Sequence, residues 1–151
     1  MKELIKKMVA IQSELKAPKN QVNSFGKYKY RSCEDIIEAV KPLLAKHNVY
    51  MLISDEIVEV GGKNYVKAEA TIYDGDNKIS ASAVARESID KKGMDDAQQT
   101  GATSSYARKY ALNGLFGIDD TKDADATNTH GNESKPEIPQ FPKPRIGNAL
   151  I

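Results

Sequence analysis

The chain has 151 residues, 40% hydrophobic and 28% charged, with a net charge of +1 at pH 7, which suffices for one domain with a buried core. No apolar run approaches the roughly 18 residues of a membrane span, and the charged first 15 residues do not resemble a signal peptide. Cys33 is the only cysteine, which excludes a disulfide within the chain, and these features together predict a protein of the reducing cytoplasm without a membrane partner.

Two helices are predicted in the first third of the chain. Residues 1–15 place leucine, isoleucine and methionine on one stripe with lysines opposite, which is the pattern of an amphipathic helix. Residues 17–25 are polar, and we expect them to form a loop. A second helix is predicted over residues 33–47, with Ser32 and Asp35 as its amino-terminal cap.

Residues 26–31 are predicted to form a short strand in which basic and aromatic side chains alternate. Its two tyrosines share one face and its three cations share the other. The cations repeat at about 6.6 Å, close to the spacing of nucleotides, so the segment is a candidate for holding a phosphate backbone. The alternative is an edge strand whose lysines protect it from aggregation. The candidate residues are Lys27, Tyr28, Lys29, Tyr30 and Arg31.

Three further strands are predicted over residues 49–60, 64–73 and 78–87. The second and third alternate small apolar residues with polar ones and are joined by a turn at 74–77, which indicates an antiparallel meander with one apolar face. A helix predicted over 97–117 is the natural cover for that face. The predicted fold class is therefore α+β, with a β-β-β-α core preceded by helices.

The helix over residues 97–117 carries a pair of adjacent cations in its middle. Asp95 and Gln98 form a capping box that marks its start. At helical spacing its small residues and Tyr110 fall on one side, suited to packing, and Arg108 and Lys109 point away from that side. We therefore expect this pair to face either solvent or a binding partner.

The composition changes after residue 118, where we place a domain boundary. Residues 1–118 hold 18 lysines and arginines against 15 acidic residues, a net charge of +3, whereas residues 119–151 carry a net charge of −2 and four of the six prolines. Because few apolar residues remain to be buried, we expect 119–151 to be a disordered, acidic and proline-rich tail. Its apolar end at 145–151 is suited to docking on another protein.

Motifs for nucleotide or metal chemistry are missing from the sequence. No Gly-x-x-x-x-Gly-Lys-Ser/Thr loop occurs, and no cluster of cysteine and histidine could hold zinc. A metal nuclease would need clustered carboxylates, but Asp74 and Asp76 are better explained by a turn, and Asp95 and Asp96 by a helix cap. We therefore expect neither a cofactor nor an enzymatic activity.

The last predicted helix resembles the signature of the ERF (essential recombination function) family of phage single-strand annealing proteins. From Gly101 to Ile118 it reads Gly-Ala-Thr-Ser-Ser-Tyr-Ala-Arg-Lys-Tyr-Ala-Leu-Asn-Gly-Leu-Phe-Gly-Ile. The basic and aromatic strand before a proline-containing helix is also similar to the family's amino-terminal part. Ser105 stands where threonine is usual, and Lys109 where arginine is usual, which keeps the charge but loses a bidentate phosphate contact. The resemblance covers about residues 1–120.

The resemblance implies a phage-encoded, ATP-independent protein that binds single-stranded DNA and anneals complementary strands in homologous recombination, in the cytoplasm of the bacterial host. The family is thought to share its β-β-β-α core with the eukaryotic annealing protein of double-strand break repair, which forms rings and binds single strands in a basic groove. A homo-oligomeric ring or filament is implied, in which repeated subunits align cations that are sparse on each one.

The residues that we expect to contact DNA are Lys27, Tyr28, Lys29, Tyr30, Arg31, Arg86, Lys91, Lys92, Tyr106, Arg108 and Lys109. We expect the tail to contact a replication or recombination protein. The alternative function is a passive protein that binds and protects single-stranded DNA without annealing it.

Overall fold

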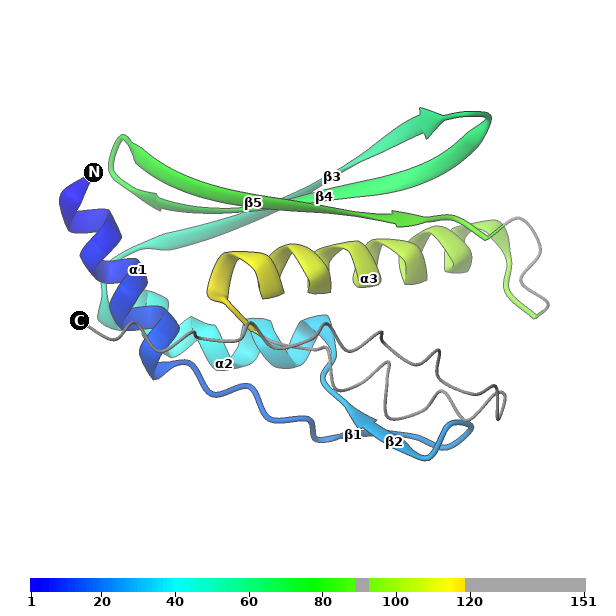
Figure 1. The fold of residues 1–151 in the computed structure, drawn as a ribbon, viewed down its shortest axis with the longest axis horizontal. Coiled ribbons are helices and arrows are strands. Elements are labelled where there is room, and N and C mark those ends of the chain that lie inside the picture. Colours follow the sequence, from blue (N-terminus) through cyan, green and yellow to red (C-terminus); the bar gives the residue numbers. More distant parts are fainter. Residues whose placement is uncertain (89–92, 119–151) are drawn as a thin grey trace, which may run out of the picture.

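The computed structural model describes residues 1–88 and 93–118 of the chain. Its elements are α1 (Lys2–Glu14), β1 (Gln21–Asn23), β2 (Tyr28–Tyr30), α2 (Cys33–Lys46), β3 (Tyr50–Val60), β4 (Lys63–Asp74), β5 (Asn77–Arg86) and α3 (Asp96–Phe116). The three long strands form an antiparallel sheet in the order β3-β4-β5, and α3 lies along one face of it (Figure 1). The remaining helices pack on α3 from the other side, so the α+β class with a β-β-β-α core is confirmed.

Alternation of small apolar and polar residues creates the face of the sheet that α3 covers. The central strand β4 buries Val66, Ala68, Ala70 and Ile72 on this face. In the sheet register, Ala70 lies between Ile53 of β3 and Ala81 of β5. Because these side chains are small, α3 approaches the sheet closely, as predicted from its own small residues. The buried residues on this side of α3 are Thr103, Ala107 and Ala111.

Both capping boxes predicted from the sequence are present. The Asp95 carboxylate accepts a hydrogen bond from the backbone N–H of Gln98 at 2.8 Å, and the Gln98 side chain accepts one from the backbone of Asp95. Ser32 and Asp35 make the same reciprocal pair at the start of α2. Each cap satisfies backbone donors that a helix leaves unpaired, which contributes about 1 kcal/mol.

The amino-terminal helix α1 closes the core at the end of the molecule away from β1 and β2 (Figure 1). It buries Leu4, Met8 and Ile11, which confirms its predicted amphipathic character. The Gln12 amide donates a hydrogen bond of 2.9 Å to the backbone carbonyl of Leu115, which fixes α1 to the end of α3. No helix in the described part of the chain is long and apolar enough to cross a bilayer.

The segment predicted as a polar loop contains a strand. β1 pairs antiparallel with β2, so that Gln21 lies opposite Tyr30. The hairpin turns at Asn23, whose side chain accepts hydrogen bonds from the backbone N–H groups of Phe25 and Gly26. With three residues, β1 is too short to show a period of two, and its formation depends on pairing with β2.

Two of the predictions lie outside the described residues. These are the tail at 119–151 and the DNA contacts of Lys91 and Lys92.

Candidate nucleic-acid interface

Helix α3 presents different side chains to each of its neighbours. Its small residues face the sheet, while the carboxyl-terminal half also buries Leu112, Leu115 and Phe116 toward the other helices. This second buried side was not predicted, because the sequence showed only the small-residue face. The tyrosines and the two cations in the middle of α3 therefore lie along its edges, between its neighbours.

Arg108 is held by Asp55 of β3. Its Nε lies 3.0 and 3.1 Å from the two carboxylate oxygens, and Nη2 lies 3.0 Å from Oδ2. Ser104 donates a hydrogen bond to the same carboxylate. Burial disfavours the charged form of Asp55, but the hydrogen bonds from Arg108 and Ser104 outweigh it and lower the pKa of the carboxyl. Arg108 therefore has an ionic partner within the chain, which the sequence did not predict, while its side chain remains 39% exposed.

Lys109 points to the opposite edge of α3, toward the hairpin. Its Nζ lies 6.0 Å from the centre of the Tyr30 ring, within the range of a cation–π contact. Tyr28 packs on Tyr30 with the ring centres 6.1 Å apart. Burial, and then the neighbouring hydroxyls of Tyr28, Tyr110 and Tyr30, raise the pKa of Tyr106. The fold therefore gathers an aromatic and basic surface from two segments far apart in sequence.

We call this surface the hairpin–helix surface and define it by Tyr28, Tyr30, Tyr106 and Lys109. All four were predicted from the sequence to contact DNA, and the tertiary structure brings them together. Arg86, another predicted residue, lines a groove together with Tyr106 between the end of β5 and α3. The surface thus continues from the hairpin across α3 to the edge of the sheet.

Tyr110 was missed by the sequence reasoning, which placed it on the side of α3 that packs against the sheet. In the structure its side chain is 49% exposed and lies beside Tyr106. The spacing of four residues between the two tyrosines was the signal that could have identified it, since such residues lie on the same side of a helix.

The predicted face of three cations on the basic strand does not form. Arg31 is buried, and its Nε donates a hydrogen bond of 2.7 Å to the backbone carbonyl of Ala17. The strand spans only the three residues from Tyr28 to Tyr30, so Lys27 lies outside it, in the hairpin turn. Its φ is 53°. Lys29 is exposed in the middle of β2. Arg31 therefore holds the chain between α1 and β1 in place, and Lys29 is the cation that the strand itself presents.

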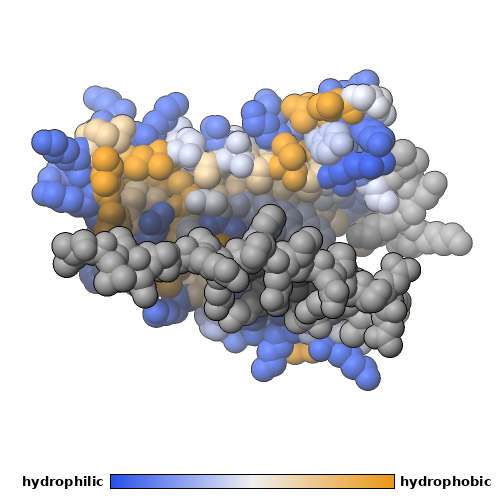
Figure 2. Space-filling view, in the orientation of Figure 1, coloured by the Kyte–Doolittle hydropathy of each residue, from blue (hydrophilic) through white to orange (hydrophobic). Residues whose placement is uncertain are grey.

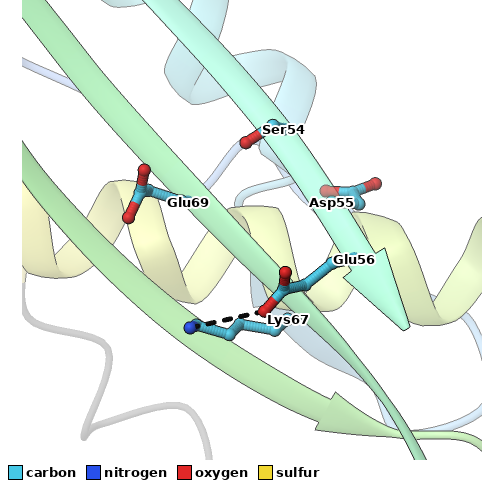
Figure 3. Close-up of a pocket in the computed structure, with 5 residues that line it drawn as sticks. All are labelled: Ser54, Asp55, Glu56, Lys67 and Glu69. Atoms are coloured by element: carbon cyan, nitrogen blue, oxygen red, sulfur yellow. Dashed lines mark ion pairs between the residues drawn. The ribbon is translucent and has the colours of Figure 1, made fainter. Parts of the chain in front are cut away.

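The other side of the sheet has a different charge. A pocket on β3 and β4 receives the side chains of Glu56, Glu69 and Lys67, and Lys67 Nζ lies 3.5 Å from Glu56 (Figure 3). Phosphates are repelled by such a site, so it is unsuited to a DNA backbone. In the described residues, no group of three or more histidine, cysteine, aspartate and glutamate side chains is placed to hold a metal ion. The pocket is lined by Ser54, Asp55, Glu56, Lys67 and Glu69.

Hydrophobic side chains are also exposed over the sheet, among hydrophilic ones (Figure 2). Tyr50, Leu52 and Val84 are each more than half exposed. By the sheet register these three lie on the face opposite α3, which no described helix covers. This face is therefore mixed in character, and it carries an aromatic pair of its own, because the rings of Tyr50 and Tyr73 stack with their centres 4.9 Å apart.

The fold and the site together define an α+β protein in which a hairpin, a helix and a strand edge form one aromatic and basic surface. Surfaces of this composition suit the binding of single nucleic-acid strands.

The chain belongs to the ERF superfamily, whose family model matches residues 4–144. It is 68% identical over 124 residues to the essential recombination function protein of Salmonella phage P22. The match covers 82% of this chain and 60% of the relative, so the chain spans little more than half of that protein's length. No solved structure matches the chain. The resemblance inferred from the helix signature is thereby confirmed.

Proposed function

We propose that this chain is a phage recombination protein that binds single-stranded DNA and anneals complementary strands without hydrolysing a nucleotide. The observation that carries the proposal is the hairpin–helix surface, where Lys109 and three tyrosines from separate elements meet. Membership of the ERF superfamily and the name of the phage P22 relative support a role in recombination.

On this proposal, cations hold phosphates and tyrosines stack on bases. Lys29 and Lys109 contact the backbone from the hairpin and the helix, and Arg86 extends the path to the strand edge. Phosphate contacts carry no sequence information, so binding is independent of sequence and sensitive to salt. Arg108 contributes less than an isolated arginine, because a phosphate must compete with Asp55 for its donors.

A single protomer has too little charge for this task. Its first 118 residues carry a net charge of only +3. We propose that the protein assembles into a ring or filament in the host cytoplasm, so that the surfaces of successive protomers form one basic path. A held strand then pairs with a complementary strand, and base stacking of roughly 1.4 kcal/mol per step drives the reaction without a cofactor. The protein therefore needs no catalytic residues.

The test is to mix two complementary oligonucleotides with the protein in the absence of nucleotide and follow duplex formation by fluorescence. Faster pairing than the spontaneous rate supports annealing. Slower pairing supports the alternative, a passive protein that binds and protects single strands. Loss of labelled DNA when magnesium is added would instead identify a nuclease.

A further inference from the structure

A groove of about 280 Å³ lies between the end of β5 and the outer edge of α3. The strand provides an apolar wall and a cation, and the helix provides two aromatic rings and one amide. Ala102 stands one helical turn before Tyr106, and its small side chain leaves room between the two elements. The lining includes Val84, Arg86, Gln99, Ala102, Tyr106 and Tyr110.

Aromatic side chains in this groove are exposed to water, although their rings would be more favourably buried. Tyr106 and Tyr110 are 53% and 49% exposed, and the strand contributes the small side chain of Ala85 beside them. Aromatic and apolar side chains that share one exposed depression mark a binding site on a folded protein. The occupant must offer a flat apolar face to the rings and a negative charge to Arg86.

We propose that this groove holds one unpaired nucleobase of the DNA strand per protomer. The base stacks on Tyr106 and Tyr110, and the adjoining phosphate lies against Arg86. This inference rests on the proposed function. It adds a base-binding site that includes Tyr110 and holds one base per protomer. Because every base has a π face and the Gln99 amide both donates and accepts hydrogen bonds, the site accepts any base.

The size of the groove limits what it can hold. Pockets for small ligands begin at about 300 Å³, so this groove suits one base and excludes a run of stacked bases. A base inside a duplex must be unpaired and unstacked before it can enter, which gives the site a preference for single strands. With one base of each protomer's segment held, the other bases stay available for pairing.

The first experiment fills the groove. Ala102→Leu adds bulk at the groove while keeping helix propensity and charge, and Ala97→Leu makes the same change at an exposed position of α3 outside the groove. Affinity is measured by fluorescence anisotropy for an oligo(dT) and for an abasic oligonucleotide of the same length. Ala102→Leu should weaken oligo(dT) binding by about five- to 100-fold. Its binding to the abasic strand, and both affinities of Ala97→Leu, should match the wild type.

A second pair of variants keeps the test sound if Ala102→Leu fails to fold, which its circular dichroism spectrum would show. Tyr110→Leu keeps an apolar side chain but removes the ring, so it should lose oligo(dT) affinity by a similar factor. Tyr110→Phe keeps the ring and should bind like the wild type.

Two results would overturn the base site while leaving the proposed function in place. One is equal affinity of the wild type for oligo(dT) and the abasic strand. The other is a reduction in affinity of the groove variants that is the same for both strands, because such a reduction reflects phosphate contacts. Failure of the wild type to bind either strand would overturn the proposed function itself, and the base site with it.

Discussion

Arg108 and Lys109 are adjacent in sequence, yet they have different environments. Arg108 shares the carboxylate of Asp55, whereas Lys109 lies over the ring of Tyr30. Successive residues of a helix point about 100° apart, so Arg108 reaches β3 while Lys109 reaches β2. The dibasic pair therefore acts as two separate groups, one tied to the sheet and one on the hairpin–helix surface.

Asp55→Asn should lower the free energy of unfolding by about 1 kcal/mol at pH 7, since it removes a partly solvated ion pair. The pKa of Asp55 is lower in the folded chain than its ordinary value of 3.8. The charged Asp55 carboxylate therefore contributes its full stabilisation at neutral pH, and this stabilisation disappears as the pH falls through the pKa of the folded state. Urea unfolding of both proteins should show their difference shrinking below pH 3.8.

Glu56→Gln is the matched control for that measurement, because Glu56 follows Asp55 in β3 and pairs with Lys67 through a side chain that is 63% exposed. It should change stability little at any pH. If the difference in unfolding free energy between Asp55→Asn and the wild type stays constant into acid, the charge of the pair contributes nothing to stability.

Lys109→Ala should reduce the salt dependence of single-strand binding, because removing one cation from the phosphate path lowers the slope of log K against log salt by about 0.7. Lys67→Ala removes the same charge from the acidic pocket on the sheet and should leave the slope unchanged. Titrations at several salt concentrations measure both slopes. Equal slopes for the two variants would place the DNA elsewhere.

At the scale of elements, the hairpin β1–β2 depends on α3 for its position. It is a two-stranded ribbon, which is marginally stable alone. Tyr30 contacts Lys109 of α3, and Arg31 bonds the backbone at Ala17. The strand alternation was visible in the sequence, but the depth to which each of its cations is buried depends on these neighbours.

Variants of β2 separate structure from binding. Arg31→Ala should lower the free energy of unfolding by about 1–3 kcal/mol, because it leaves the Ala17 carbonyl without this donor. Lys29→Ala should leave stability within about 0.5 kcal/mol of the wild type, as is usual for exposed residues, and weaken single-strand binding. Thermal melts and anisotropy give the two quantities. Weaker DNA binding without loss of stability for Arg31→Ala would instead support the three-cation face predicted from the sequence.

For the whole molecule, the modest charge of each protomer makes assembly necessary to the proposed mechanism. The two outer strands of the sheet, β3 and β5, and the face carrying Tyr50 and Leu52 offer room for contacts between protomers in the described residues. The family match extends to residue 144, past the boundary that we placed at 118 from composition.

A chain truncated to residues 1–118 should keep both self-assembly on single-stranded DNA and annealing of bare oligonucleotides, because the β-β-β-α core and the hairpin–helix surface lie within it. Mass photometry with and without denatured DNA, together with the pairing assay, measures this. A 151-residue chain that stays monomeric on DNA would contradict the shared basic path. Loss of annealing in the truncated chain alone would assign the tail a direct part in the reaction.

The sequence by itself determined the helices, the three-stranded meander and both capping boxes, because periodicity and short-range hydrogen bonds are written in consecutive residues. It also identified the four residues that define the hairpin–helix surface, although not that they lie together. Only the tertiary structure decided that Arg108 pairs with Asp55, which lies 53 residues away, that Arg31 is buried, and that Tyr110 is exposed beside Tyr106. The environment of a side chain is set by elements distant in the chain, and local spacing carries no record of them.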